Sequence, residues 1–427
     1  MNGDPRSHGL WEITAPAAPV THELDRDLQA DVVILGAGFT GCSAALHLAE
    51  RGVRAIVLEK NDIGFGGSGR NVGLVNAGMW VMPDELPRVL GAEYGERLLT
   101  QLGDAPSVVF DLIDRFAIEC EATRTGTLHC AVGRRGFEEI RERARQWQAR
   151  GADVVLLGSK DVARLVGTPR YEGALLDRRA GTIQPLAFVR GLARVAIELG
   201  ASVFTRSEAL RRESISDRWK ITTARGSVTA GCVLLATDVY GAGDGAAIQN
   251  EQVRLPYFQM ATAPLSEGAR RSILPERQGA WDTKQVLSSF RLDQSGRLIF
   301  GSVGALRGGG ARIHRDWSRR ELARLFPQLG EVPMEHEWFG MIGMTADALP
   351  RLHIHDRQVF SISGYNGRGI GPGTVMGRNL ARLALGEVAI RDLPLPVTDL
   401  SPARLRTLEE AFYEVGAQIA HFTGARV

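Results

Sequence analysis

The hydrophobic pattern between residues 31 and 60 predicts a strand, a glycine turn, a helix and a second strand. Residues 31–35 form a short apolar run, and residues 42–50 are rich in Ala and Leu. A second apolar run covers residues 54–58 and ends at Glu59. Short, continuous apolar runs separated by a helical segment are typical of parallel strands that are buried on both faces. The pattern therefore predicts a βαβ unit.

The turn inside this unit has the sequence Gly-Ala-Gly-Phe-Thr-Gly from Gly36 to Gly41. In such a turn Gly36 permits the tight bend, Gly38 lets a pyrophosphate approach the backbone, and Gly41 allows close packing of helix and strand. The free N–H groups at the helix start favour phosphates. Glu59, 23 residues after Gly36, can accept hydrogen bonds from an adenosine ribose. The arrangement predicts a dinucleotide site, and a purely structural glycine turn is the alternative.

Further along the chain, helical periodicity alternates with apolar runs. Strands are expected at 126–132, 202–204, 219–223, 227–229, 233–238, 258–262, 286–291, 297–300, 335–344 and 359–363, and helices at 83–120, 137–166, 186–199, 316–326 and from about Thr374 onward. The alternating strands between 253 and 304 indicate an antiparallel sheet that is separate from the nucleotide fold.

Two more glycine-rich segments lie beside predicted strands. Residues 64–73 hold five glycines together with Ser, Arg and Asn, directly after the βαβ unit. Residues 364–374 follow the last apolar strand and lead into a helix. Both suit a backbone that must come close to a ligand, and the second is another candidate anion site. A flexible surface loop is the alternative for residues 64–73.

Composition narrows the class of protein. A chain of 427 residues is long for one hydrophobic core, so two domains are expected. With 44% hydrophobic residues, 23% charged residues and a net charge of +2, it has no nucleic-acid or membrane footprint. Residues 1–30 do not read as a secretory signal, and no segment has the length of a spanning helix. The four cysteines lack metal-ligand spacing, and a reducing cytoplasm is the expected location.

An ordered set of short stretches resembles the FAD-dependent amine and amino-acid oxidoreductases of the D-amino-acid oxidase superfamily, and within it the gamma-glutamylputrescine oxidoreductase branch. The stretches are Leu10–Ala15, Ser68–Gly73, Gly181–Pro185, Leu235–Thr237, Trp338–Gly340 with Thr345–Asp347, and Gly364–Gly367. The resemblance covers nearly the whole chain. Two positions depart from the branch, because Val72 replaces a glycine and Arg368 stands where relatives often have His. Both lie near the expected flavin ring, so the resemblance leaves the substrate open.

The resemblance implies an α/β fold with a Rossmann-type FAD-binding domain and an inserted antiparallel-sheet substrate domain. The FAD-binding domain would comprise residues 1–80, 176–245 and 345–427, and the substrate-binding domain residues 81–175 and 246–344. The expected cofactor-binding residues are Gly36, Gly38, Phe39, Thr40, Gly41, Glu59, Lys60, Gly67, Ser68, Arg70, Asn71, Val72, Gly73, Ala209, Ala236, Thr237, Gly367, Arg368, Gly369, Ile370, Gly371, Gly373 and Thr374. FAD is expected to be non-covalent, because residues 338–344 contain no Cys and His47 lies well inside its helix.

The implied chemistry is hydride transfer from the carbon next to an amine nitrogen to flavin N5. The resulting imine is hydrolysed, and oxygen or another acceptor reoxidises the flavin. The protein would position the C–H bond, so no catalytic base is required, and His353 and His355 are read as structural. The alternatives are a nicotinamide-dependent dehydrogenase, which leaves the loops at 64–73 and 364–374 unexplained, and a flavin-binding protein without turnover.

The expected substrate is an amine that carries a carboxylate or another anionic group, such as an N-substituted or D-amino acid or a gamma-glutamylated amine. Arg291 ends an apolar strand and precedes the hairpin-turn signal at residues 293–296. Amino-acid oxidases of the superfamily place a carboxylate-binding Arg on a comparable strand, and a guanidinium can bind a carboxylate with two parallel hydrogen bonds. The alternative is that Arg291 pairs with a carboxylate of its own chain. The other candidates for the same cavity are Arg368, Tyr257 and Lys284.

Overall fold

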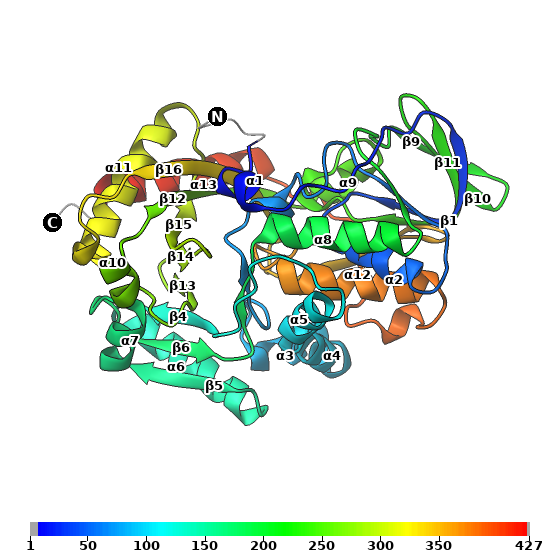
Figure 1. Ribbon diagram of the computed structural model, residues 1–427. Coiled ribbons are helices and arrows are strands. Elements are labelled where there is room, and N and C mark those ends of the chain that lie inside the picture. The colour runs from blue at the N-terminus through cyan, green and yellow to red at the C-terminus, as the bar shows by residue number, and fades with distance from the viewer. Residues whose placement is uncertain (1–6, 425–427) are drawn as a thin grey trace.

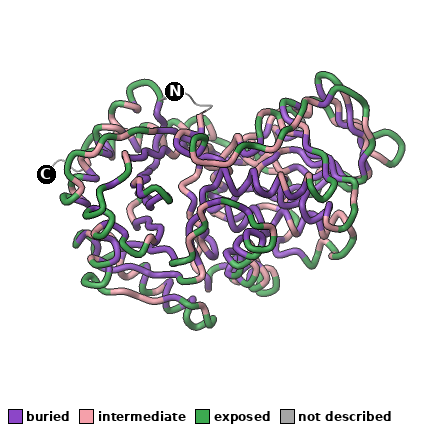
Figure 2. The backbone as a smooth tube through the Cα atoms, in the orientation of Figure 1, coloured by how far each residue is buried: buried purple, intermediate pink, exposed green. Residues whose placement is uncertain are grey.

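The computed structural model describes residues 7–424, and residues 1–6 and 425–427, at the ends of the expected FAD-binding domain, lie outside the described part. Two eight-stranded sheets stand side by side in Figure 1, with helices packed around both. Buried backbone runs through the strands and the central helices of both halves (Figure 2). In the described residues, no helix combines the length and the apolar character that crossing a membrane requires.

The first sheet has a mainly parallel core in the order β17-β18-β11-β1-β2-β8. Its strands are β1 (Asp27–Leu35), β2 (Ala55–Leu58), β8 (Ser202–Phe204), β9 (Arg211–Ile215), β10 (Arg218–Thr222), β11 (Ser227–Leu235), β17 (Arg351–Asp356) and β18 (Val359–Ser363). In the centre, Val33 of β1 lies opposite Val233 of β11 and Ile56 of β2, which explains the continuous apolar runs. The hairpin β9–β10 and the edge strand β17 pair antiparallel.

Three helices pack together on this sheet and carry the glycine-rich segments. Helix α2 (Phe39–Ala49) lies between α8 (Pro185–Glu198) and α12 (Ile370–Ala384) (Figure 1). Contact between α2 and α12 is close, because a Cβ atom on Gly377 would overlap the Thr40 carbonyl and stand 2.7 Å from Ser43 Cβ. The Ser43 hydroxyl also donates to the Thr374 carbonyl at 2.7 Å. The N-termini of both helices are thereby fixed at one end of the sheet.

The second sheet is mostly antiparallel, in the order β16-β12-β15-β14-β13-β4-β6-β5. Its strands are β4 (Thr127–Ala131), β5 (Val154–Gly158), β6 (Gly173–Asp177), β12 (Val253–Pro264), β13 (Gly279–Asp282), β14 (Ser288–Leu292), β15 (Arg297–Val303) and β16 (Met334–Met344). Strands β13 and β4 pair in parallel and join two distant parts of the chain. A small pair, β3 (Leu74–Val75) and β7 (Gly181–Thr182), lies at the crossing between the two halves.

The remaining helices cover the edges and the outer faces of the sheets. They are α1 (Leu10–Thr14), α3 (Leu86–Leu90), α4 (Ala92–Gly103), α5 (Ala105–Arg115), α6 (Gly133–Ala149), α7 (Ser159–Val166), α9 (Ala246–Asn250), α10 (Glu267–Ser272), α11 (Gly308–Leu325) and α13 (Arg406–Thr423). Helices α11 and α13 pack against each other, and α13 also packs on β12.

Several predicted boundaries were wrong. The helix expected over residues 137–166 is interrupted by β5, because Gly151 ends α6 with φ of +76° and four apolar residues follow at 154–157. The helix expected from about Thr374 begins four residues earlier, at Ile370, and α11 begins at Gly308 instead of residue 316. In both cases the first turn contains glycines, whose low helix propensity led the sequence analysis to place the helix start too late.

The close contact of α2 and α12 makes a stability prediction. Replacing Gly377 by Ala should lower the free energy of unfolding by about 1 to 3 kcal/mol, because the added methyl group meets α2 backbone. The midpoint of urea unfolding of the purified protein measures this loss. The matched control is Gly268→Ala in α10, where a Cβ has open space. Because Ala favours a helix more than Gly does, this control should keep or slightly raise the free energy of unfolding. Equal midpoints for Gly377→Ala and the unchanged protein would contradict the close-packing argument.

Candidate active site

A cavity of about 770 Å³ lies at the carboxyl ends of the parallel strands of the first sheet. Leu35 of β1, Leu58 of β2 and Ala236, just after β11, line it on this side. Residues of β12, β14 and β16 line it on the side of the second sheet. Ligands of open α/β sheets bind at these strand ends.

Most of the predicted cofactor-binding residues meet in this cavity. Those that line it are Gly36, Gly38, Phe39, Thr40, Glu59, Lys60, Gly67, Ser68, Arg70, Asn71, Val72, Ala209, Ala236, Thr237, Gly367, Arg368, Gly369 and Ile370. Those that do not line it are Gly41, Gly73, Gly371, Gly373 and Thr374. These five lie behind the wall: a Cβ on Gly41 would overlap the Gly36 carbonyl, and one on Gly373 would stand 3.3 Å from Phe39 Cβ.

Glu59 is fixed at the nucleotide end of the cavity by two backbone hydrogen bonds. Its Oε2 accepts from the Ala37 N–H and its Oε1 from the Asn61 N–H, both at 2.8 Å. Burial raises the pKa of the Glu59 carboxyl, and the two N–H donors act in the opposite direction. Nearby, Lys60 forms an ion pair with Glu208 at 3.0 Å. The carboxylate of Glu59 therefore stands with a fixed orientation where the sequence places an adenosine ribose.

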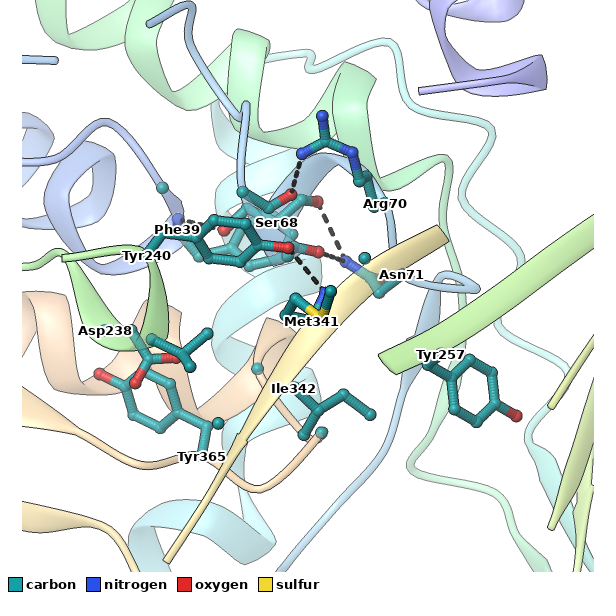
Figure 3. A pocket seen from close by; sticks show the side chains of 18 of the residues that line it. Phe39, Ser68, Arg70, Asn71, Asp238, Tyr240, Tyr257, Met341, Ile342 and Tyr365 are labelled. Carbon is teal, nitrogen blue, oxygen red and sulfur yellow. Dashed lines mark hydrogen bonds between the residues drawn. The ribbon is translucent and has the colours of Figure 1, made fainter. Parts of the chain in front are cut away.

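The loop at residues 64–73 is held firmly beside the start of α2. The Ser68 hydroxyl accepts from the Phe39 N–H at 3.0 Å, and the Asn71 amide donates to two loop carbonyls at 3.0 Å. Two buried indoles donate to consecutive carbonyls of the loop, Trp338 to Arg70 and Trp11 to Asn71. Figure 3 shows Ser68, Arg70 and Asn71 gathered on one side of the cavity. This loop is a rigid wall rather than a flexible surface segment.

The second glycine-rich loop is tied to both sheets. The Asn366 side chain accepts from the Thr345 N–H at 2.8 Å, and Asp238 accepts from the Gly364 N–H at 2.9 Å. Burial raises the pKa of Asp238, which sits in a left-handed conformation with φ of +45°. The Tyr365 hydroxyl shares a hydrogen bond of 2.8 Å with Thr40 of α2. The start of α2 and the loop that leads into α12 thus share one hydrogen-bonded frame.

The cavity has the donors that FAD needs. The N-caps of helices α2 and α12 are Gly38 and Gly369, and neither has a side chain that could cap its helix. The Phe39 N–H is engaged by Ser68, and the remaining first-turn N–H groups can serve a phosphate or the flavin ring. A Cβ on Gly38 would stand 2.9 Å from the Ser68 hydroxyl and would fill the approach path. Among the described residues the buried Thr237 hydroxyl on the cavity wall has no hydrogen-bond partner. Glu59 completes a set that fits an adenine dinucleotide.

Arg368 lies at the opposite end of the cavity between aromatic rings. Its guanidinium carbon is 4.6 Å from the ring centre of Trp80 and 5.5 Å from that of Trp281. One nitrogen donates to the Ala77 carbonyl at 2.9 Å, and the buried Nε has no partner in the described part of the chain. Burial, with repulsion from Arg143, lowers the pKa of Arg368 to about 9. The residue is a buried cation that faces a cavity.

Arg291 and Lys284 differ from the sequence prediction. Arg291 is 1% exposed and does not line the cavity. Its Nε donates to the Leu292 carbonyl and its Nη1 to the Ile183 carbonyl. Its Nη2 lies 3.9 Å from the Glu121 carboxylate. The Lys284 Nζ forms an ion pair with Glu321 Oε1 at 2.6 Å. Because these donors are satisfied inside the protein, neither residue is placed to bind a substrate carboxylate. Tyr257 does line the cavity and bonds the Ser289 hydroxyl at 2.8 Å.

Sequence reasoning missed the aromatic part of the wall. Trp80, Trp281 and Tyr240 line the cavity but lie outside any motif, and only their size marks them as candidates. Tyr365 also lines the cavity and belongs to the Gly364–Gly367 stretch, but it was not among the expected site residues. His353 is buried between Glu251 and the Thr398 carbonyl, as expected for a structural histidine. Residues 7–424 hold no cluster of His, Cys, Asp and Glu that could bind a metal ion.

Comparisons with known proteins identify the family of this chain. The family model described as DAO, FAD dependent oxidoreductase, matches residues 31–383. The gamma-glutamylputrescine oxidoreductase of Escherichia coli (strain K12) is 31% identical over 404 residues, which cover 92% of each chain. The probable oxidoreductase OrdL of Haemophilus influenzae is 28% identical over 84% of this chain and 83% of its own.

Solved structures show the same fold. Glycine oxidase from Geobacillus kaustophilus superposes with a TM-score of 0.70 at 20% identity, covering 88% of this chain and 99% of that chain. L-proline dehydrogenase from P. horikoshii also superposes with a TM-score of 0.70, at 17% identity, covering 86% of this chain and 97% of that chain. With the family model spanning most of its length, this chain belongs to the DAO family of FAD-dependent oxidoreductases.

Proposed function

We propose that this flavoprotein oxidises the C–N bond of an amine that carries a carboxylate, such as an N-substituted or D-amino acid or a gamma-glutamylated amine. Bound FAD supplies the acceptor for the hydride that leaves the carbon beside the nitrogen, and oxygen or another acceptor restores it. The names of the related gamma-glutamylputrescine oxidoreductase and glycine oxidase support this class of substrate. The alternative of a nicotinamide-dependent dehydrogenase does not agree with membership of the FAD family.

The observation that carries the proposal is the buried guanidinium of Arg368. A buried cation is costly unless an anion or further hydrogen bonds compensate it. Among the described residues, Arg368 donates one hydrogen bond, to the neutral Ala77 carbonyl, and its buried Nε has no acceptor. Arg143, also buried, donates to the carbonyls of residues 79–81 and adds positive charge nearby. A substrate carboxylate bound to Arg368 would supply the missing acceptor.

The rest of this end of the cavity suits the reactive nitrogen. Its lining residues are neutral or aromatic, apart from the arginines; they include Tyr257, Gln259, Trp281, Gln285, Leu287 and Ser289. In such surroundings an ammonium ion is disfavoured by desolvation and by the positive charge of Arg368. The cavity would therefore select the neutral amine, whose lone pair assists loss of the hydride, while the aromatic rings exclude water.

We also propose that Gly36, Gly38, Glu59, Ser68, Asn71, Thr237 and the starts of α2 and α12 hold the FAD. The four cysteines are all buried, and none lines the cavity, which supports non-covalent binding. The four free thiols are compatible with a reducing cytoplasm.

Changes at the nucleotide end should weaken FAD retention. Glu59→Ala should weaken FAD binding by about 1 to 3 kcal/mol through lost charged hydrogen bonds, and Gly38→Leu should abolish it by closing the phosphate approach. Flavin content after gel filtration and titration of the apoprotein measure both. The matched control is Gly158→Ala, at an exposed position without positive φ where a Cβ meets nothing within 4 Å. Full flavin content in Gly38→Leu would contradict the assignment.

FAD should leave the protein on denaturation. Acid precipitation should give a colourless pellet and a yellow supernatant whose cofactor co-elutes with authentic FAD. A yellow pellet would show a covalent bond and would contradict the prediction, and FMN or a nicotinamide in the supernatant would contradict the cofactor assignment.

Arg368→Met should raise KM for a carboxylate-bearing amine about ten- to a thousandfold, which corresponds to about 1.4 to 4 kcal/mol. Stopped-flow bleaching of the flavin by a panel of amines without oxygen identifies the substrate, and absence of bleaching across the panel would favour a flavin-binding protein without turnover. The matched control is Arg254→Met, which removes a less buried cation from the same cavity. Amide analogues should not distinguish Arg368→Met from the unchanged enzyme. If Arg368→Met keeps its KM, the carboxylate assignment fails.

A further inference from the structure

The C-terminal helix α13 turns its larger apolar side chains away from the protein. Ala417 and His421 form its buried face, which packs on β12 and α11. Its outer face, including the N-cap, carries large apolar residues, each between 53% and 72% exposed: Leu405, Leu408, Phe412, Val415, Ile419 and Phe422. These are six of the 14 large hydrophobic side chains that are exposed in the described residues. Scattered exposed hydrophobics are ordinary, but a contiguous set on one helix marks an interface.

The spacing of these six residues is that of a two-helix seam. From Leu405 to Phe422 the steps alternate between three and four residues without interruption. This repeat averages 3.5 residues and is the pattern of positions a and d in a coiled coil. An amphipathic helix whose only partner is its own protein core carries that stripe on the buried face. Here the stripe lies on the opposite face.

The exposed area matches the apolar part of a dimer interface. Six side chains of this size, rather more than half exposed, present on the order of 500 Å² of apolar surface. A standard interface buries roughly 800 Å² per partner, and homodimer interfaces are about 65% apolar, which also gives roughly 500 Å². The stripe can therefore form the apolar core of a dimer of this chain.

Charge along α13 favours an antiparallel pair. In its first half, Glu410 pairs with Arg406 and Glu414 with Arg307, Glu409 has no ion pair among the described residues, and residues 415–423 contain no Asp or Glu. A parallel pair would place the two Glu409 carboxylates at the same level of the seam, whereas an antiparallel pair places each beside a half without carboxylates and opposes the two helix dipoles favourably. Ala411 and Gly416 flank the seam and permit close approach of the two helices.

We propose that α13 pairs antiparallel with α13 of a second copy of this chain, around a two-fold axis between Phe412 and Val415. The contact is isologous, so each pair of residues occurs twice, once on each side of the axis. Three pairs repeat across the axis: Leu405 with Phe422, Leu408 with Ile419, and Phe412 with Val415. This inference is independent of the proposed substrate.

The same helix contributes to the cavity wall. Tyr413, next to Phe412 in the chain, lines the cavity, and Glu410 accepts from the backbone N–H of Arg254 at 3.1 Å. Pairing through the outer face of α13 would hold the helix, and with it the part of the cavity wall that Tyr413 forms, in place.

Size measurements on the holoenzyme test the pairing. Light scattering after gel filtration should give the mass of two chains for the unchanged protein and of one chain for Phe412→Glu, whose dissociation constant should rise at least about thirtyfold. The matched control is Val20→Glu, which places the same charge at a residue that is 85% exposed and far from α13 in sequence, and it should remain a dimer. An unchanged protein with the mass of one chain, or Phe412→Glu with that of two, would overturn the proposal.

Crosslinking tests the orientation without depending on the stability of Phe412→Glu. The double variant Leu408→Cys/Ile419→Cys should form a disulfide between two chains on mild oxidation. These positions are about 16 Å apart within one helix, too far for a disulfide inside a chain. The native cysteines are buried, so the background should be low. Each single variant should stay uncrosslinked; a crosslink in Leu408→Cys alone indicates a parallel pair and overturns the antiparallel arrangement, as does a double variant that stays uncrosslinked.

Discussion

The close contact between α2 and α12 is the constraint on which the active site depends. Gly377 lets α12 approach the backbone of α2, and Ser43 and Tyr365 bridge the two helices by hydrogen bonds. Both helices begin at the same cavity, so two helix N-termini with glycine N-caps are brought together at one cavity. One can serve the phosphates and the other the flavin ring, because each N-terminus carries a partial positive charge. A wider separation of these helices would leave two unrelated anion sites.

The second sheet completes the site by holding the loop between the halves. Trp338 of β16 is 1% exposed and donates to the Arg70 carbonyl. Trp11 of α1 donates to the Asn71 carbonyl. The two indoles also meet edge to face, with ring centres 5.5 Å apart. Each hydrogen bond satisfies a carbonyl whose burial without a donor would cost free energy of folding. Trp11 and Trp338, 327 residues apart in the chain, therefore fix the glycine-rich loop that lines the cavity.

Two buried arginines show how environment decides the role of a side chain. Arg291 and Arg368 are both almost fully buried, and burial lowers the pKa of each, to about 10 and about 9. Arg291 donates to carbonyls of its own chain and has Glu121 close by, whereas Arg368 faces the cavity with unused hydrogen-bonding capacity. Only the second can bind a substrate anion without first breaking internal bonds.

Local sequence determined the nucleotide half of this protein. The glycine spacing from Gly36 to Gly41, the apolar strands and Glu59 could be recognised because each depends on neighbours within a few residues or on one short βαβ unit. The substrate end could not be read in the same way. Trp80, Trp281 and Arg368 meet only through the pairing of distant strands, such as β13 with β4, and side-chain burial is set by that packing. The sequence therefore identified the cofactor, and the tertiary structure decided which arginine faces the cavity.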